Sequence, residues 1–330
     1  MRAYIIRRLL LAIPTVFLIS VLVFFMVRLI PGDVVDAMAA LLVERGVTNL
    51  EVARESIEQS LGLDVSTPVQ YGRWIGVLPG EDGSLSGLLQ GEWGKSLWRP
   101  SSVVDEVARR WPVTLELGLM GLIIAQLIAL PIGVYSALRQ DTWGDYIGRS
   151  FAIFAIAVPG FWIATMIIIF PAIWWGYMPP IMHVPFLEDP LRNLRMFIVP
   201  GIILGMALSG ETMRMTRSMM LEVLRQDYIR TAWAKGLKER VVVIRHTLKN
   251  ALIPVITLIG LQVPVLVGGT VIIEQIFVLP GMGLLILDSI KLRDYPVVSG
   301  VVLFFGVGIV LINLLVDLTY GFLDPRIRYR

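Results

Sequence analysis

Six stretches of the chain contain no Asp, Glu, Lys or Arg and are rich in apolar residues. A helix of roughly 20 apolar residues crosses a bilayer core about 30 Å thick, and most of these stretches have about that length. The pattern therefore predicts an all-α polytopic membrane protein with six transmembrane helices. The six stretches are residues 9–27, 117–138, 150–187, 196–210, 250–273 and 295–316.

Two of these stretches do not have the length of a single span. Residues 150–187 are too long, and we expect the proline pair at 179–180 to end one span and leave an apolar outer loop. Residues 196–210 are too short. They reach full length only if the next turn, which contains Glu211 and Arg214, forms the cytoplasmic end of the span.

The distribution of Lys and Arg predicts the orientation of the spans. Residues 1–8, 138–149, 211–250 and 323–330 carry many more basic side chains than the short loops on the opposite side. Cytoplasmic loops are enriched in Lys and Arg. We therefore expect both termini in the cytoplasm and the long loop at 31–111 outside.

The predicted spans divide the chain into three parts. Residues 1–30 are expected to form a cytoplasmic N-terminus and the first, uncleaved transmembrane helix. Residues 31–111 form an extracytoplasmic loop, in which the mixture of apolar and charged positions at 50–61 predicts an amphipathic helix. Residues 112–330 form a five-helix core, whose main cytoplasmic loop is 211–250.

The composition excludes an ordinary soluble domain. Hydrophobic residues make up 56% of the chain and charged residues 17%, whereas soluble domains are about 45–50% apolar and about 25% charged. The net charge of +3 is too small to indicate nucleic-acid binding. The absence of Cys excludes disulfides, thiolate metal sites and Cys nucleophiles.

The motifs that would indicate catalysis or ligand binding are incomplete. The sequence Gly91-Glu-Trp-Gly-Lys-Ser96 is similar to the end of a phosphate-binding loop, but Leu89 stands where that loop needs Gly. His183 and His246 are too far apart in the sequence to indicate a metal site. We therefore expect no catalytic residue, bound cofactor or metal in this chain.

The cytoplasmic segment 211–250 carries the most information about function. It predicts a short helix, a turn at Gly236 and a second helix that runs into the fifth span, because Gly adopts the left-handed conformation that ends helices. Two hypotheses remain open from the residues alone: a helical knob that enters a partner's cleft, or a basic loop that serves only to orient the spans. The basic residues of the segment include Arg225, Arg230, Lys235, Lys238, Arg240, Arg245 and Lys249.

The sequence Ala232-Trp-Ala-Lys-Gly236, followed by Arg245-His-Thr-Leu-Lys-Asn-Ala-Leu-Ile-Pro254, resembles the coupling loop of ABC importer permeases of the dipeptide, oligopeptide and nickel branch. Arg230-Thr231-Ala232 stands where the wider importer consensus has Glu-Ala-Ala, a substitution common in the peptide branch. The likeness extends along the whole chain, at 7–10, 28–33, 61–64, 70–71, 91–96, 221–228, 280–281, 293–298 and 324–328.

The resemblance implies a type I importer permease that forms half of a transmembrane pair in a bacterial or archaeal cytoplasmic membrane. The second, homologous permease would complete the pathway for peptides or similar small solutes. Two cytosolic ATPase subunits would bind ATP and Mg, and an extracytoplasmic solute-binding protein would deliver the substrate. No nucleic acid is expected as a partner.

The resemblance also assigns roles within the loop. Arg245, His246 and Asn250 would brace the second helix. The first helix and its turn would contact an ATPase through Asp227, Tyr228, Thr231, Ala232, Ala234, Lys235, Gly236 and Leu237.

Charges inside spans are costly and indicate functional sites. The sequence indicates few of them, all near span ends: Glu116, Glu211, Arg214 and Asp317. A direct role in gating or in the pathway is one interpretation for Glu211. Pro264, Gly268 and Gly269 are candidates for a hinge in the fifth span, with helix packing as the alternative interpretation.

Two other classes of membrane protein were compared with this pattern. A secondary, ion-coupled transporter predicts an inverted repeat and ionisable residues near the middle of the membrane, and the sequence indicates neither. An intramembrane enzyme predicts motifs such as His-Glu-x-x-His or Gly-x-Ser-x-Gly, which the chain lacks. The importer permease is therefore the preferred hypothesis.

Overall fold

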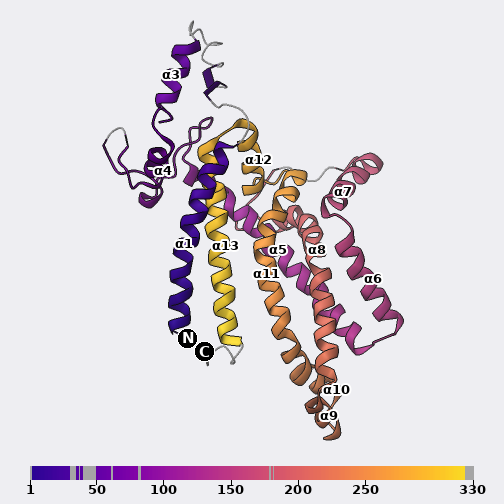
Figure 1. Cartoon of the computed structure of the whole chain (residues 1–330). Helices are drawn as coiled ribbons and strands as arrows, with labels where there is room; N and C mark the ends of the chain where they lie inside the picture. The colour runs from indigo at the N-terminus through magenta and orange to yellow at the C-terminus, as the bar shows by residue number, and fades with distance from the viewer. Residues whose placement is uncertain are drawn as a thin grey trace. The chain divides into compact units, whose positions relative to one another are not determined.

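The computed structural model describes residues 2–29, 35–36, 38–39, 50–60, 62–80, 83–177, 180 and 182–323. Within this part of the chain the structure is helical and contains no β-strand, only an isolated bridge between Lys95 and Ser102 (Figure 1). The elements are α1 (Arg2–Arg28), α3 (Leu50–Ser60), α4 (Thr67–Ile75), η1 (Leu88–Gln90), α5 (Val103–Leu138), α6 (Trp143–Ala157), α7 (Gly160–Trp175), α8 (Pro190–Leu224), α9 (Asp227–Ala234), α10 (Glu239–Val241), η2 (Val242–Leu248), α11 (Lys249–Phe277), α12 (Met282–Leu292) and α13 (Tyr295–Leu323).

Five helices in the described residues are long and apolar enough to cross a membrane. Each overlaps one of the six predicted spans, so the prediction of several apolar membrane helices is confirmed. The α8 helix includes the turn with Glu211 and Arg214, as the length argument required. The five are Ile5–Arg28, Val103–Leu138, Pro190–Leu224, Glu239–Leu266 and Tyr295–Leu318.

The remaining predicted span, in residues 150–187, is not one straight helix. It consists of α6 and α7, which meet at an angle of 90°. Pro159 lacks a backbone N–H and disfavours helical geometry at the residue before it, and Val158 is indeed extended, with ψ of 122°. The predicted span is therefore divided into two helices, and the break lies at the proline. Gly176, at φ of +62°, caps the end of α7.

A second sharp bend follows the fifth span. The last residues of α11, Thr270–Phe277, meet α12 at 81°. Val278 ends α11 in the left-handed conformation, with φ of 54°, and Leu279 is fully buried just after it. The hydrophobic pattern did not predict α12.

The chain forms two compact units, each built from segments distant in sequence. The first consists of Met1–Leu9, Pro112–Leu284 and Leu311–Arg330, and the second of Leu10–Trp111 and Leu285–Val310. The boundary between the units falls inside single helices. In α5, for example, residues 103–111 belong to the second unit and residues 112–138 to the first.

The core of the first unit is formed by apolar side chains of α5, α8 and α11. Phe197 and Leu117 are fully buried in this core. At Gly205 of α8, an added Cβ would lie 2.7 Å from the backbone oxygen of Gly121 in α5, so the two helices approach closely only because Gly is present. The glycines of this stretch therefore serve helix packing.

The first and last membrane helices are joined within the first unit by one ion pair. Arg8 of α1 lies 2.8 Å from Asp317 of α13. Asp317, predicted as a charge near a span end, is thus neutralised by a local partner.

The core of the second unit includes aromatic contacts between α1 and α4. Phe24 packs against Tyr71 and Trp74, with ring centroids 5.1 and 5.5 Å away. The hydroxyl groups of Tyr71 and Ser20 are 2.9 Å apart. The aromatic residues of the outer loop therefore pack on the first membrane helix.

The sequence made two further predictions for residues 31–111, concerning an amphipathic helix and the segment similar to a phosphate-binding loop. The predicted amphipathic helix is α3, whose Ile57 is buried against Val35 and Ala39; position 61 lies outside the described residues. The segment similar to a phosphate-binding loop, residues 91–96, is mostly irregular and includes the bridge at Lys95, and the Ser96 hydroxyl donates to the carboxylate of Asp294. Its hydroxyl group has a structural partner in this chain.

Candidate functional site

Residues 211–250, which the sequence predicts to be a cytoplasmic segment that couples to a partner, include a compact helical knob. Beyond the end of α8, the eight-residue helix α9 lies against the start of the second helix. Ile229 and Ala232 are three residues apart, so they share one face of α9. Both are buried in a small cluster with Val242, packed by Val223 and Leu224. This apolar contact fixes the orientation of α9 on the knob.

The predicted turn at Gly236 is present. Gly236 has φ of +73°, in the left-handed region where a residue without Cβ has no strain. Its N–H donates to the oxygen of Trp233 at 2.9 Å, and the N–H of Leu237 donates to the oxygen of Ala232 at 3.4 Å. No atom lies within 4 Å of a Cβ added at Gly236. A side chain there would be opposed by backbone strain and not by a clash.

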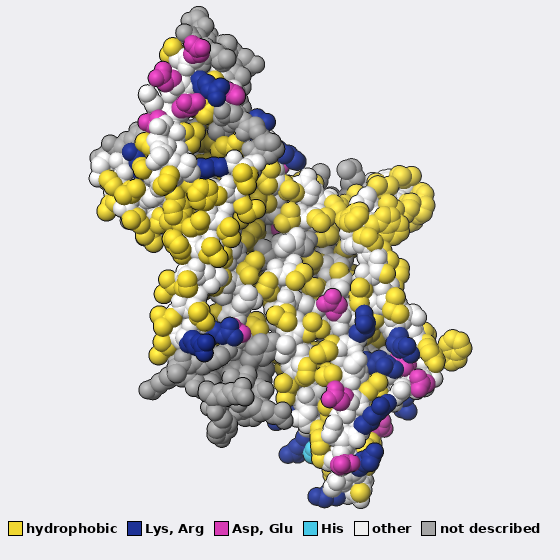
Figure 2. All heavy atoms as spheres, viewed as in Figure 1, with side chains coloured by type: hydrophobic (Ala, Val, Ile, Leu, Met, Phe, Trp, Pro, Cys, Tyr) yellow, Lys and Arg dark blue, Asp and Glu magenta, His cyan; other side chains and the backbone are white. Residues whose placement is uncertain are grey.

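The outward face of the knob combines aromatic and basic side chains. Tyr228 and Trp233 are each 45% exposed, and Leu237 is 36% exposed. Figure 2 shows that Lys and Arg side chains gather over the α9 and α10 end of the first unit, where fewer hydrophobic side chains cover the surface. Asp227, Thr231, Ala234, Lys235 and Gly236 are also exposed, and so are Arg225, Arg230, Lys238, Arg240 and Arg245.

At two positions the exposure of side chains on α9 differs from the predicted contact set. Ala232 is only 6% exposed and faces the core of its own chain, because it follows Ile229 at helical spacing. Its side chain is therefore not part of the outward surface. Trp233, which the sequence reasoning left out, is a large exposed side chain of α9 and belongs to that surface. An exposed Trp in a short amphipathic helix was the signal that could have identified it.

The second helix of the knob contacts the first through Asn250. Its Nδ2 atom donates to the Tyr228 hydroxyl oxygen at 3.0 Å and to the His246 carbonyl at 2.8 Å. Asn250 thus joins the start of α11 to α9. Arg245 is exposed and His246 is partly buried.

The helix between the knob and the fifth span contains a π-helical segment, η2. The Thr247 hydroxyl donates to the Val242 carbonyl five residues earlier, at 3.1 Å. Such segments are rare and often lie at functional sites. The sequence predicted a continuous helix here, and continuity holds, but no Pro or Gly in the segment indicated the π geometry.

A buried ion pair above the knob was also missed. Arg217 of α8 donates to both carboxylate oxygens of Asp145 at the start of α6, at 2.7 Å each. Asp145 is fully buried. The sequence analysis did not predict this pair, because Asp145 and Arg217 lie 72 residues apart in two segments predicted as cytoplasmic loops, and no local pattern reveals the contact.

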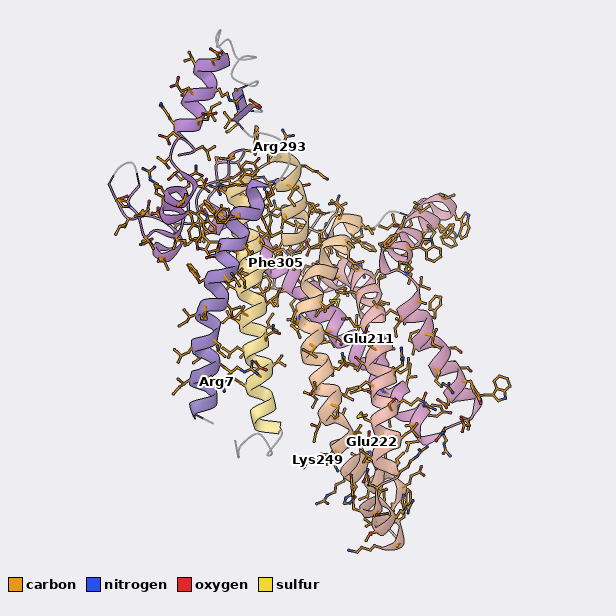
Figure 3. The ribbon with its side chains drawn as sticks, in the orientation of Figure 1. Arg7, Glu211, Glu222, Lys249, Arg293 and Phe305 are labelled. Atoms are coloured by element: carbon orange, nitrogen blue, oxygen red, sulfur yellow. The ribbon has the colours of Figure 1, made fainter. Side chains whose placement is uncertain are left out.

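The predicted hinge and pathway residues lie on α8 and α11. Pro264, Gly268 and Gly269 are inside α11, which is continuous from Lys249 to Phe277. Figure 3 labels Glu211 along α8, together with Glu222 nearer the knob. Glu211 is exposed. The two helices are joined by a buried polar contact, in which Gln262 Nε2 donates to the Thr212 hydroxyl at 3.1 Å and to the Leu208 carbonyl at 3.2 Å.

One buried acid in the membrane helices has no counterpart in the predicted set. Glu274 immediately follows the uncharged stretch 250–273 and is fully buried near the end of α11. The sequence did not single out Glu274, because the uncharged stretch ends just before it and a charged residue at the end of a span is ordinary. The nearby Pro280-Gly281 pair was the signal that the chain bends back there.

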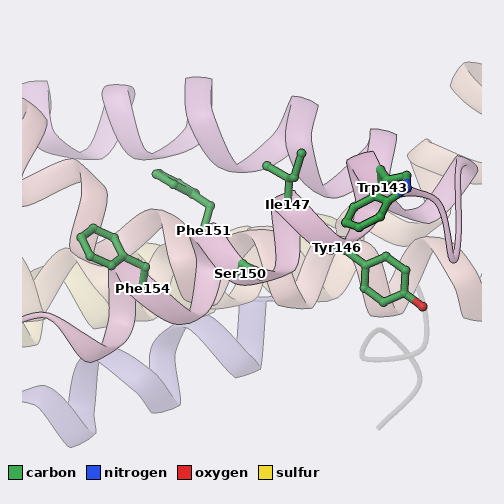
Figure 4. Close-up of a pocket in the computed structure, with 6 residues that line it drawn as sticks. All are labelled: Trp143, Tyr146, Ile147, Ser150, Phe151 and Phe154. Atoms are coloured by element: carbon green, nitrogen blue, oxygen red, sulfur yellow. The ribbon is translucent and has the colours of Figure 1, made fainter.

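The outer surface of α6 carries an open apolar groove of about 430 Å³. Figure 4 shows its lining of Trp143, Tyr146, Ile147, Ser150, Phe151 and Phe154. Ser150 is its one side chain with a hydroxyl apart from Tyr146. Trp143 is 84% exposed. An open apolar face suits lipid or another apolar helix and offers no charged group to a polar substrate.

Fold and site together define a polytopic α-helical membrane protein with a helical knob outside the membrane. Two family models cover nearly the whole chain. Residues 129–329 match the binding-protein-dependent transport system inner membrane component, and residues 1–118 match the N-terminal part of such membrane components. The chain belongs to this family, and it is therefore a multi-pass inner-membrane transport component.

Individual relatives match this chain over nearly their full length. A putative peptide transport system permease protein of Brucella abortus is 40% identical over 329 residues, which cover 100% of both chains. The glutathione transport system permease protein GsiC of Pectobacterium atrosepticum is 36% identical over 327 residues, 99% of each chain. Both are permeases, so the family is one of transport components and not of enzymes.

A solved structure shares the fold. The crystal structure of an amino acid ABC transporter with histidines aligns with a TM-score of 0.51 at 13% sequence identity, covering 66% of this chain and 94% of that chain. At this identity the match establishes the fold alone, which is that of an ABC transporter permease.

Proposed function

We propose that this chain is a permease subunit of an ATP-driven importer of peptides or similar small solutes. A second, homologous permease completes the translocation pathway, and an extracytoplasmic binding protein delivers the substrate. The observation that carries the proposal is the end-to-end match to peptide and glutathione permeases. The exposed helical knob, which is suited to a soluble partner, supports it.

Six spans with both termini in the cytoplasm are consistent with the helices. The five single helices and the bent pair α6 and α7 give six crossings, with α12 folding back outside the membrane core. An even number of crossings leaves both termini on one side. The pair between Arg8 and Asp317, near the start of α1 and the end of α13, supports this arrangement.

The knob is proposed as the surface that docks on a cytosolic ATPase. Tyr228, Trp233 and Leu237 are the large apolar side chains exposed on the knob, which also exposes basic side chains. Exposed aromatic side chains commonly contribute most to the free energy of binding at interfaces. ATP and Mg are bound by the two ATPases, and this chain contributes no nucleotide, cofactor or metal site.

Movement of the ATPases would reach the membrane through the two helices that leave the knob. On one side α8 is tied to α6 by Arg217 and Asp145. On the other side α11 follows the knob through η2. Pro264, Gly268 and Gly269 in α11 and Glu211 in α8 are the proposed gating or pathway residues on these helices.

Purification of the assembled transporter tests the subunit assignment. The tagged chain, solubilised under mild conditions, is expected to copurify with a second permease and two ATPase subunits. A chain that purifies alone, or that transports substrate on an ion gradient without any ATPase, contradicts the proposal. The comparisons support the importer and not the ion-coupled alternative.

A further inference from the structure

The bend between α11 and α12 is held by a buried carboxylate. Both oxygens of Glu274 accept hydrogen bonds: Oε1 from the Thr114 hydroxyl at 2.7 Å, and Oε2 from the backbone N–H groups of Gly283 at 2.7 Å and Leu284 at 3.2 Å. The N–H groups belong to the first turn of α12, where a negative charge is favoured. The carboxylate therefore connects α11, α12 and α5.

Thr114 of α5 makes a second bond at the same place. Its hydroxyl oxygen accepts from the N–H of Met282 at 2.8 Å while it donates to Glu274. Thr114, Glu274 and Met282 are all buried. One hydroxyl group thus fastens both sides of the bend to α5.

The bend also stores backbone strain. Val278 has φ of 54° and ψ of 39°, a left-handed conformation in which a β-branched residue is an outlier. Helices that end in this way usually place Gly at the position. Strain at Val278 and a network of buried bonds at Glu274 oppose each other within a few residues.

The space around the carboxylate is closed. A Cβ at Gly281 would overlap the Glu274 carboxylate, and a Cβ at Gly283 would overlap Val271. The Glu274 carboxyl thus fills a closed space between α11, α12 and α5, and its hydrogen bonds hold the strained bend in the arrangement that the structure shows.

We propose that Glu274 is a positioning residue that latches the α11–α12 bend to α5, and that release of this latch opens the outer end of the pathway. The outward placement of the bend rests on the proposed function and orientation. The residues of the latch are Thr114, Glu274, Val278 and Met282. Breaking the bonds shifts the bend towards the open arrangement, and removing the strain at Val278 shifts it towards the closed one.

Cysteine labelling in the assembled transporter tests this directly. The chain contains no Cys, so a single Met282→Cys reporter, buried in the closed bend, has no background within the chain. Its labelling by a membrane-impermeant maleimide from the outer side is measured without substrate or nucleotide, in otherwise native, Glu274→Gln, Thr114→Val, Thr114→Ser and Val278→Gly backgrounds. Leu279→Cys, also fully buried in the native chain, is a second reporter.

The latch predicts a specific order of rates. Glu274→Gln keeps only one of the two acceptor oxygens, so it cannot accept from both Thr114 and the N–H groups of α12, and Thr114→Val removes the hydroxyl; each is therefore expected to accelerate labelling about tenfold. Thr114→Ser keeps the hydroxyl and retains the native rate. Val278→Gly labels more slowly than the native chain. An exposed reporter on the same helix, Ile290→Cys, labels equally in every background.

Three results overturn the latch. They are a native labelling rate in both Glu274→Gln and Thr114→Val, faster labelling in Val278→Gly, and rapid labelling of both reporters in the native background. A role in folding alone would not give opposite shifts for Glu274→Gln and Val278→Gly. Since the assay uses neither ATP nor substrate, its failure is distinct from failure of the importer assignment, which the subunit composition and ATP-driven uptake test separately.

Discussion

Asn250, at the start of α11, donates a hydrogen bond to the hydroxyl oxygen of Tyr228 in α9, 3.0 Å away. The two residues are 22 positions apart and belong to the two helices of the knob. Tyr228 also lies on the face proposed to dock on an ATPase. The contact therefore gives a direct path from the docking surface to the helix that enters the membrane.

Removal of this contact should weaken the link without unfolding the knob. Tyr228→Phe keeps the ring and loses the bond, at an expected cost of about 0.5–1.5 kcal/mol. ATPase subunits should still copurify, while substrate-stimulated ATP hydrolysis falls a fewfold. Asn250→Ala should show the same loss, and the double variant should be no worse than either single one. Additive losses would mean that the two residues act independently.

The turn at Gly236 gives a prediction that depends on backbone geometry alone. Gly236→Val places a β-branched residue at φ of +73° and should cost about 1–3 kcal/mol in the knob. We expect normal membrane insertion and reduced recovery of ATPase subunits on the tagged chain.

The matched control is Gly236→Asn, because Asn tolerates the left-handed region. No atom lies close to an added Cβ, so Asn should bind the ATPases nearly as well as Gly. Equal loss in both variants would point to a steric role for Gly236 at the interface, in place of the turn geometry.

Among the exposed apolar side chains of the docking surface, Trp233 should contribute most to the free energy of ATPase binding. Trp233→Ala is expected to weaken ATPase binding by about 2 kcal/mol or more, as truncation of an interface Trp commonly does. The affinity of detergent-solubilised permease for the ATPase is the measurement. Trp143→Ala on α6, which removes an equally large exposed ring away from the knob, should leave that affinity unchanged.

The buried pair of Asp145 and Arg217 should matter for stability. Asp145→Ala leaves the guanidinium of Arg217, which is 19% exposed, without its partner, with an expected loss of about 3–5 kcal/mol, seen as a lower unfolding temperature of the purified complex. The exposed pair of Lys291 and Asp288, 3.9 Å apart, is the comparison. Its removal by Asp288→Ala should leave the unfolding temperature unchanged, since exposed pairs contribute little.

Local sequence patterns predicted the helices and the turn of the knob well. Uncharged stretches indicate membrane helices because a span needs a long apolar surface, and the left-handed turn at Gly236 follows from the lack of a side chain. Pro159 explains why α6 ends, but the 90° angle between α6 and α7 also depends on packing around the two helices. No local sequence pattern predicts that angle.

The missed features all depend on contacts between distant residues. Asp145 and Arg217 meet across 72 positions, and Thr114 and Glu274 across 160. Each polar residue, taken alone, resembled an ordinary span terminus. The helical spacing of Ala232 from Ile229 indicates that its side chain faces the core of the knob, but the resemblance to the coupling loop placed it among the predicted ATPase contacts. The family resemblance indicated the knob as a candidate site, but it did not indicate which of its side chains are exposed.

The central claim is that transport through this permease is driven by its ATPase partners. The most direct measurement is uptake of labelled peptides and glutathione by proteoliposomes that contain the permease pair, binding protein on the outer side and ATP inside. We predict uptake when the ATPases are present, and none when they are omitted or when a non-hydrolysable ATP analogue replaces ATP. Uptake that persists without the ATPases, or that follows an ion gradient, would contradict the account.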